Sequence, residues 1–147
     1  MENILISACL LGVSCRYDGC SVQYPEVSAL SEKYNLIPVC PEIYGGLPTP
    51  RVPAERILDK VINKEGGDVT ENYKKGADIA LGLARELNCR AAILKERSPS
   101  CASHEIYDGT FTKTRISGMG VTAELLSKNG IKVYSENEIE KLLNDKL

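Results

Sequence analysis

The sequence is poor in several residue types that would each support a particular class of protein. Its 147 residues include no tryptophan, one phenylalanine and one histidine. A single histidine excludes a metal site built mainly from imidazole ligands. No apolar run approaches the ~20 residues that cross a bilayer, and the N-terminus lacks the basic, apolar and small-residue order of a secretory signal. We therefore expect a cytoplasmic protein without a membrane partner.

An excess of positive charge is also missing. Lysine and arginine number 18, aspartate and glutamate number 20, and the formal net charge is −2. That balance argues against a protein whose main work is to cover a nucleic-acid backbone. Hydrophobic residues make up 43% and charged residues 26%, which is ordinary for a globular protein. No linker, repeat or change of composition divides the chain, so we expect one domain spanning residues 1–147.

Cysteine, by contrast, is plentiful, with six residues in the chain. Because thiols stay reduced in the cytoplasm, six of them need another explanation than a disulfide framework. Metal binding, catalysis and core filling are the candidates. Cys89 is most simply interpreted as a buried structural thiol, and Cys20 as a small side chain in a turn. Cys15 stays open between a structural and a functional role.

Short apolar runs alternate with helical patterns along the chain. Runs without polar alternation, bounded by turn residues, indicate strands that are covered on both faces. Strands that alternate with helices predict a parallel sheet between two layers of helices. We therefore expect an α/β, three-layer Rossmann-like fold with a mostly parallel sheet. The predicted strands are residues 3–8, 36–39, 91–94 and 131–134, and the predicted helices are residues 25–34, 71–88, 121–128 and 136–144.

The segments between these elements carry strong turn signals. Three prolines and two glycines within residues 43–53 forbid regular structure there, and we interpret this long loop as the ordered wall of a pocket. Residues 60–63 and 68–70 flank a Gly-Gly pair, which predicts a small hairpin outside the main sheet. Residues 102–111 are expected to form an irregular polar stretch.

Three cysteines each follow a predicted strand. Cys9, Cys40 and Cys101 stand directly after, or one turn after, a short apolar run. Because the carboxyl ends of parallel strands meet at one edge of a sheet, we expect these thiols to converge where open α/β sheets bind ligands. Three thiolates could hold zinc with one open position, or an iron–sulfur cluster with one iron not held by the protein. Simple packing of three small thiols is the alternative, and the spacing does not separate zinc from iron.

Two carboxylates lie close in sequence to these thiols. Glu42 follows Cys40 by two residues, and Glu96 follows the third predicted strand. A carboxylate beside a metal site can act as a general acid or base. A salt bridge is the alternative for each, and Glu96 is the weaker candidate because basic residues flank it on both sides.

Polar residues complete the predicted site. Ser98 and Ser100 could donate hydrogen bonds to a ligand or cap the turn that carries Cys101. Arg16, Tyr17 and Asp18 could orient a polar ligand or brace the loop in which they lie.

Several stretches together carry a family resemblance. They are Ser7–Gly12, Cys15–Gly19, Pro38–Glu42, Gly45–Arg51, Glu96–Cys101 and Ile106–Phe111. With these motifs the chain resembles the DUF523 family over nearly its whole length. The family includes thiouracil desulfidases that use a [4Fe-4S] cluster held by three cysteines. The resemblance implies that Cys9, Cys40 and Cys101 are the ligands.

The resemblance also implies a reaction. We expect a desulfidase that acts on a thiolated pyrimidine, 2-thiouracil or a close analogue, with the open iron binding the sulfur as a Lewis acid. Glu42 would activate water, and Ser98 or Ser100 would hold the ring. The remaining predicted substrate contacts are Arg16, Tyr17, Asp18 and Glu96.

Two departures from the family pattern lie beside the predicted pocket. Ala102 follows the third cysteine where we expect glycine, and His104 stands where we expect a small residue.

Two other functions are compatible with the cysteines of this chain. One is a zinc hydrolase with the same three thiolates, and the other is a non-enzymatic thiol or cluster sensor in which Cys15 and Cys20 exchange disulfides.

Overall fold

The fold is built around a four-stranded parallel sheet, as seen in a computed structural model that describes residues 1–19, 24–145 and 147. Cys20 therefore lies outside the described residues. The spatial order of the strands is β2-β1-β5-β8. These strands are β1 (Glu2–Ser7), β2 (Tyr34–Val39), β5 (Ala91–Leu94) and β8 (Lys132–Ser135), and neighbouring strands pair in parallel.

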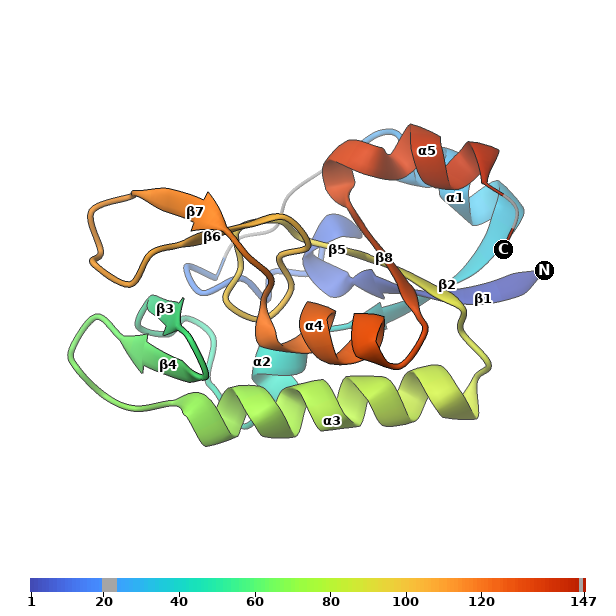
Figure 1. Cartoon of the computed structure of the whole chain (residues 1–147). Coiled ribbons are helices and arrows are strands. Elements are labelled where there is room, and N and C mark those ends of the chain that lie inside the picture. Colours follow the sequence, from blue (N-terminus) through green and yellow to red (C-terminus); the bar gives the residue numbers. More distant parts are fainter. Residues whose placement is uncertain (20–23, 146) are drawn as a thin grey trace.

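Helices cover both faces of this sheet, as Figure 1 shows. Successive side chains of a strand point to opposite faces, so Ile4 packs toward one helical layer and Leu5 toward the other. Both residues are fully buried, because neither face of β1 meets solvent. The first layer contains α1 (Val27–Lys33) and α5 (Ile139–Asn144), and the second contains α3 (Thr70–Glu86) and α4 (Val121–Lys128). The expected three-layer α/β fold is confirmed.

The predicted boundaries shift by a few residues. β2 begins at Tyr34, directly after α1, and α3 ends at Glu86. The last helix opens with a 3-10 turn, η2 (Glu136–Glu138), ahead of α5. A capping box starts this turn. The Ser135 side chain accepts a backbone N–H from within the turn, and the Glu138 carboxylate accepts the backbone N–H of Ser135.

One local prediction was incomplete and one was wrong. The predicted pairing across the Gly-Gly turn is present, because Ile62 and Asp68 form an antiparallel bridge and the Val69 N–H donates to the Val61 carbonyl at 2.9 Å. However, β4 (Lys60–Asn63) also pairs with β3 (Ala54–Ile57) in an antiparallel hairpin that was not predicted. The turn between β3 and β4 contains Leu58 at φ 54° instead of the glycine or asparagine that signals such turns. The wrong prediction concerns residues 102–111. They contain β6 (Glu105–Tyr107), which pairs with β7 (Arg115–Ser117) over three residues, too few for a readable pattern.

Both hairpins stand beyond the carboxyl edge of the main sheet (Figure 1). Two short helical segments lie at the same edge, η1 (Ala8–Leu10) after β1 and α2 (Pro41–Tyr44) after β2. The next strand in sequence, β2, pairs with one edge of β1, and the later strand β5 pairs with the opposite edge of β1. The boundary between β1 and β5 is therefore the topological switch point, outside which open sheets bind ligands. No helix of the described residues is long and apolar enough to cross a membrane.

Candidate active site

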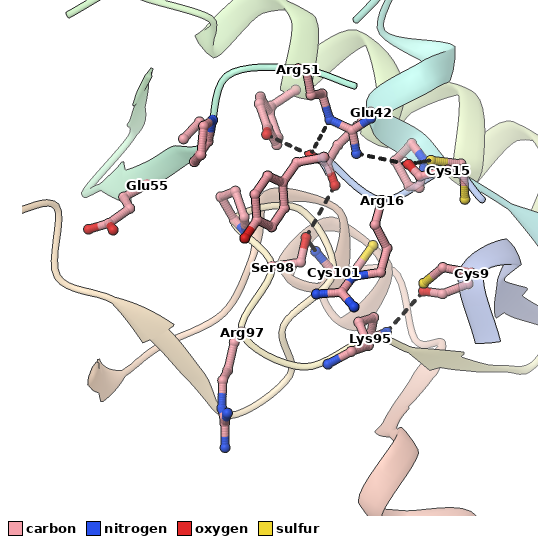
Figure 2. Close-up of a pocket in the computed structure, with 18 of the residues that line it drawn as sticks. Cys9, Cys15, Arg16, Glu42, Arg51, Glu55, Lys95, Arg97, Ser98 and Cys101 are labelled. Carbon is pink, nitrogen blue, oxygen red and sulfur yellow. Dashed lines mark hydrogen bonds and ion pairs between the residues drawn. The ribbon is translucent and has the colours of Figure 1, made fainter. Parts of the chain in front are cut away.

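A cavity of about 420 Å³ opens between the strand ends and the two hairpins. Cys9, Cys40 and Cys101 all line it, although they are far apart in the sequence. Cys15 lines it as well, and Figure 2 shows the sulfurs of Cys9, Cys15 and Cys101 around one space. Cys89 precedes β5 and so lies at the opposite edge of the sheet, as expected for a structural thiol.

Each thiol is placed by the element that ends or begins beside it. Cys9 lies in η1, Cys40 is the N-cap of α2, and Cys101 lies in the turn after β5. The Cys40 thiol points to the backbone carbonyl of Cys15 at 3.8 Å. Together with Glu42 these four cysteines form what we call the thiol half of the pocket.

The surroundings raise the pKa of two of these thiols, Cys40 and Cys101, and so favour their protonated form. Burial, followed by the negative charges of Glu42 and Cys40, raises the pKa of Cys101 to about 12. The hydrogen bond with Cys15, followed by burial, raises the pKa of Cys40. Because a thiolate is the form that binds metal, any metal group entering this site must displace protons.

The Glu42 carboxylate is fixed from several sides. Its Oε2 atom accepts hydrogen bonds from Arg51 Nε at 3.1 Å and from the Tyr73 hydroxyl at 2.7 Å. Its Oε1 atom accepts from the Ser98 hydroxyl at 3.4 Å, on the side of Cys101 (Figure 2). The arrangement leaves one oxygen bound to the protein framework and turns the other toward the cavity.

Arg51 joins Glu42 to the loops of the thiol half. Its side chain is only 5% exposed, and its Nη2 atom donates to the Cys15 carbonyl at 3.1 Å. Burial lowers the pKa of Arg51, but the charge and the hydrogen bond of Glu42, with smaller contributions from Cys40 and Tyr73, together outweigh it and the net shift is upward. Its Nη1 atom donates to Pro48 and Thr49 in the proline-rich loop. That loop is therefore an ordered wall, as predicted.

Sequence reasoning gave no role to Arg51 or Tyr73. Arg51 stood in a family motif without an assigned function, and Tyr73 fell within the predicted helix of residues 71–88 without a role. Tyr73 is 2% exposed, and burial followed by the Glu42 charge raises its pKa. A buried tyrosine normally finds a partner for its hydroxyl, which was the one available signal.

The two predicted serines have different surroundings. Ser98 lines the cavity, and its Oγ atom accepts the backbone N–H of Ser100 at 3.0 Å and of Cys101 at 3.1 Å. Ser100 is fully buried, its hydroxyl lies 2.8 Å from Thr122 Oγ1, and it is not among the lining residues. Both serines shape the turn that carries Cys101, and of the two Ser98 faces the cavity.

The loop after Cys15 contributes two of its three predicted contacts. Arg16 and Tyr17 line the cavity, whereas Asp18 does not. Arg16 and Asp18 form a loose ion pair of 4.0 Å near the surface. The Tyr17 carbonyl accepts the backbone N–H of Arg51 at 2.7 Å, which attaches this loop to the proline-rich wall.

Glu96 lines the cavity, but its oxygens are occupied by the segment that leads into β6. Oε1 accepts the backbone N–H groups of His104 and Glu105, both at 3.0 Å. Oε2 lies 3.2 Å from the Ser103 hydroxyl and 3.1 Å from His104 Nδ1. Burial raises the pKa of Glu96, but these hydrogen bonds outweigh it and the net shift is downward. The carboxylate therefore anchors a wall of the pocket.

The opposite wall is formed by β3, β4, β6, β7 and their loops, which we call the hairpin half. Glu55, Tyr107 and Phe111 line the cavity from this side. Arg56 attaches β3 to the body of the protein, because it donates to the Met119 carbonyl at 2.7 Å and to Glu124 at 2.8 Å. Nothing in the sequence pattern signalled these contacts.

No group of three or more Cys, His, Asp or Glu side chains in residues 1–19, 24–145 and 147 is arranged around the position of one metal ion. The four thiols instead face a shared cavity. They come from separate strand ends and loops, so the cavity is the feature they have in common.

Comparisons with known proteins give a consistent result. A family model described as 2-thiouracil desulfurase matches residues 4–138. The uncharacterized protein YbbK of Bacillus subtilis (strain 168) is 44% identical over 150 residues, which cover 95% of this chain and 99% of that protein. A solved structure of the [4Fe-4S]-dependent thiouracil desulfidase TudS (DUF523Vcz) is 45% identical with a TM-score of 0.92. The match covers 97% of this chain and 95% of that one.

Proposed function

Because the chain belongs to the 2-thiouracil desulfurase family, we propose that it removes sulfur from a thiolated pyrimidine, 2-thiouracil or a close analogue, with a [4Fe-4S] cluster. One observation carries the proposal. Three cysteines from three strand ends line one cavity together with a fixed carboxylate. We place the reaction in the cytoplasm, where such thiols stay reduced.

The donor set fits an iron–sulfur cluster. Cysteine thiolates are the usual protein ligands of such clusters, and Cys9, Cys40 and Cys101 would hold three of its irons. Separate irons need thiols distributed around a cavity, which is how these three lie. When bound there, the cluster would supply Lewis-acid chemistry toward the thiocarbonyl sulfur.

The residues of the chain supply the rest of the chemistry. Glu42 takes a proton from water as the water oxygen attacks the carbon that bears sulfur. Arg51 and Tyr73 hold its Oε2 atom, so Oε1 is the proton acceptor. A thiocarbonyl and water give a carbonyl and hydrogen sulfide, and the atoms balance without an oxidant or a reductant.

Other residues hold the substrate and shape the cavity. Ser98, which touches Oε1 at 3.4 Å, orients the pyrimidine ring beside the base. Arg16 and Tyr17 contact the ring or its substituents from the loop that they share. We assign Ser100 to positioning because it does not line the cavity, and Glu96 because both of its oxygens bond residues 103–105.

Anaerobic purification followed by a turnover assay tests this function. We expect brown protein that contains iron and acid-labile sulfide and converts 2-thiouracil to uracil and sulfide, both followed by chromatography. Colourless protein with bound zinc would indicate the hydrolase instead. Metal-free protein whose thiols respond to redox conditions would indicate the sensor.

A further inference from the structure

The hairpin half contains a buried carboxylate that the proposed chemistry does not use. Glu55 of β3 is 8% exposed, and its side chain points away from the cysteines in Figure 2. Its Oε1 atom accepts the backbone N–H of Gly109 at 2.9 Å and of Phe111 at 3.2 Å. Because burying a charge is costly unless hydrogen bonds satisfy it, this carboxylate has a definite structural task.

The loop that Glu55 holds is strained. Phe111 adopts φ 58° and Lys113 adopts φ 61°, a region that bulky side chains rarely occupy. Such conformations persist only where surrounding contacts enforce them, and they concentrate at functional sites. The docking is also close, since a Cβ atom at Gly109 would lie 2.3 Å from Ile57 Cγ1.

The strained loop carries an aromatic ring, that of Phe111. Phe111 is the single phenylalanine of the chain and it lines the cavity opposite the thiols. An aromatic face stacks on any planar heterocycle, and this stacking contributes measurably to base binding. Ser98, Arg16 and Tyr17 can contact the ring from the thiol side of the cavity, and Phe111 offers an apolar aromatic face from the hairpin half.

We propose that Phe111 is the stacking face for the pyrimidine ring and that Glu55 is the positioning residue that holds it there. The inference rests on the proposed function, because that function supplies the planar substrate. Glu55 acts on substrate binding through Phe111, without touching the substrate.

Steady-state kinetics on the holoenzyme, with calorimetric binding of uracil, test this inference. Phe111→Leu and Glu55→Ala should each raise the KM for 2-thiouracil and weaken uracil binding by at least ~5-fold. Their kcat and iron content should stay near those of the wild type. Glu55→Gln keeps an oxygen acceptor and should restore most of the affinity. The double variant Glu55→Ala/Phe111→Leu should bind no more weakly than Phe111→Leu alone.

The control is Glu105→Ala in the same hairpin, where the side chain is 50% exposed and pairs with Arg115; it should leave KM unchanged. Additive losses in the double variant would overturn the role of Glu55, and unchanged uracil binding in Phe111→Leu would overturn the stacking face even if Glu55→Ala does not fold. Failure of the proposed function would appear differently, as wild-type protein that holds iron and sulfide but does not convert 2-thiouracil.

Discussion

The two halves of the pocket are built in different ways. The thiol half is attached to the ends of the main-sheet strands, so its cysteines converge because the strands are parallel and adjacent. The hairpin half has no such support. It is held by three side chains of little exposure, Glu55, Arg56 and Glu96, whose backbone partners lie 54, 63 and 8 residues away in the sequence.

This difference separates chemistry from shape. The thiol half holds the groups that react, and the strand ends of the main sheet bring them together. The hairpin half decides what fits against those groups, and its few buried polar contacts are each expensive to lose. Changes in the first half should therefore abolish the reaction in a folded protein, whereas changes in the second should alter binding or stability by degrees.

The largest effect should come from the thiol half itself. Changing Cys9, Cys40 or Cys101 to alanine should remove iron, acid-labile sulfide and turnover together, because each supplies one cluster ligand. Iron and sulfide assays on anaerobically purified protein measure this directly. Cys89→Ala is the matched control and should keep its iron, its acid-labile sulfide and its turnover.

Cys15 sharpens the same test, because it is buried in the thiol half without belonging to the predicted ligand set. Cys15→Ala should leave cluster content largely intact. If that variant alone empties the site, the cluster has a fourth protein ligand and the open-iron mechanism is wrong.

The second effect separates reaction from assembly within the thiol half. Glu42→Gln keeps the shape of the side chain but removes the proton acceptor. A general base contributes ~10²–10⁴-fold, so kcat should fall at least ~10²-fold while cluster content and uracil binding remain. Loss of the cluster or of binding would instead mean that Glu42 serves only to brace Arg51 and the proline-rich wall.

The same contrast explains what the sequence could predict. The central strands β1 and β5 consist largely of buried apolar residues and appear in the sequence as apolar runs. The sheet, its layers and the shared cavity of three thiols therefore followed from the sequence. The family assignment is confirmed, while the ligand and catalytic roles stay predictions. The expected pairing of residues 60–63 across the Gly66–Gly67 turn is present. The second pairing of the same residues, with β3, was not predicted, because its turn has Leu58 where a glycine or asparagine is usual.

Side-chain roles were less predictable than positions. Ser100 and Glu96 are close in sequence to Cys101. However, the Ser100 hydroxyl bonds Thr122, and the Glu96 carboxylate bonds the segment that leads into β6. Arg51 and Tyr73 reach Glu42 from other elements. Such contacts depend on where distant elements dock, and no local pattern of residues encodes this.

The third effect tests the support beneath the thiol half. Helix α3 touches α2, which carries Glu42, at Gly76, where a Cβ atom would lie 1.8 Å from the Pro41 carbonyl oxygen. Overpacking of this kind costs ~1–3 kcal/mol, so Gly76→Ala should lower the free energy of unfolding in urea titrations. Gly82→Ala lies in the same helix with nothing within 4 Å and should raise it by ~0.5–1 kcal/mol. Stabilisation by both changes would show that the two helices can separate without cost.

The smallest effect concerns Glu96, which anchors the start of β6 in the hairpin half. The pKa of Glu96 is lowered in the folded protein, since its hydrogen bonds outweigh the opposing effect of burial. A lowered pKa means that the carboxylate stabilises the fold above the unfolded-state pKa of ~4.3. That stabilisation is lost as the pH falls through the folded-state pKa.

We therefore expect Glu96→Gln to lower the free energy of unfolding by ~1 kcal/mol near neutral pH, because Gln offers only one oxygen acceptor where the carboxylate uses two. The difference from the wild type should shrink in urea titrations below about pH 4. Glu105→Gln is the control, since an exposed ion pair contributes little at any pH. A Glu96→Gln difference that stays constant into acid would show that side-chain shape, and not the charge, holds β6 against the pocket. The hairpin half would then depend on packing at this point, and Glu55 and Arg56 would remain as the charges that organise it.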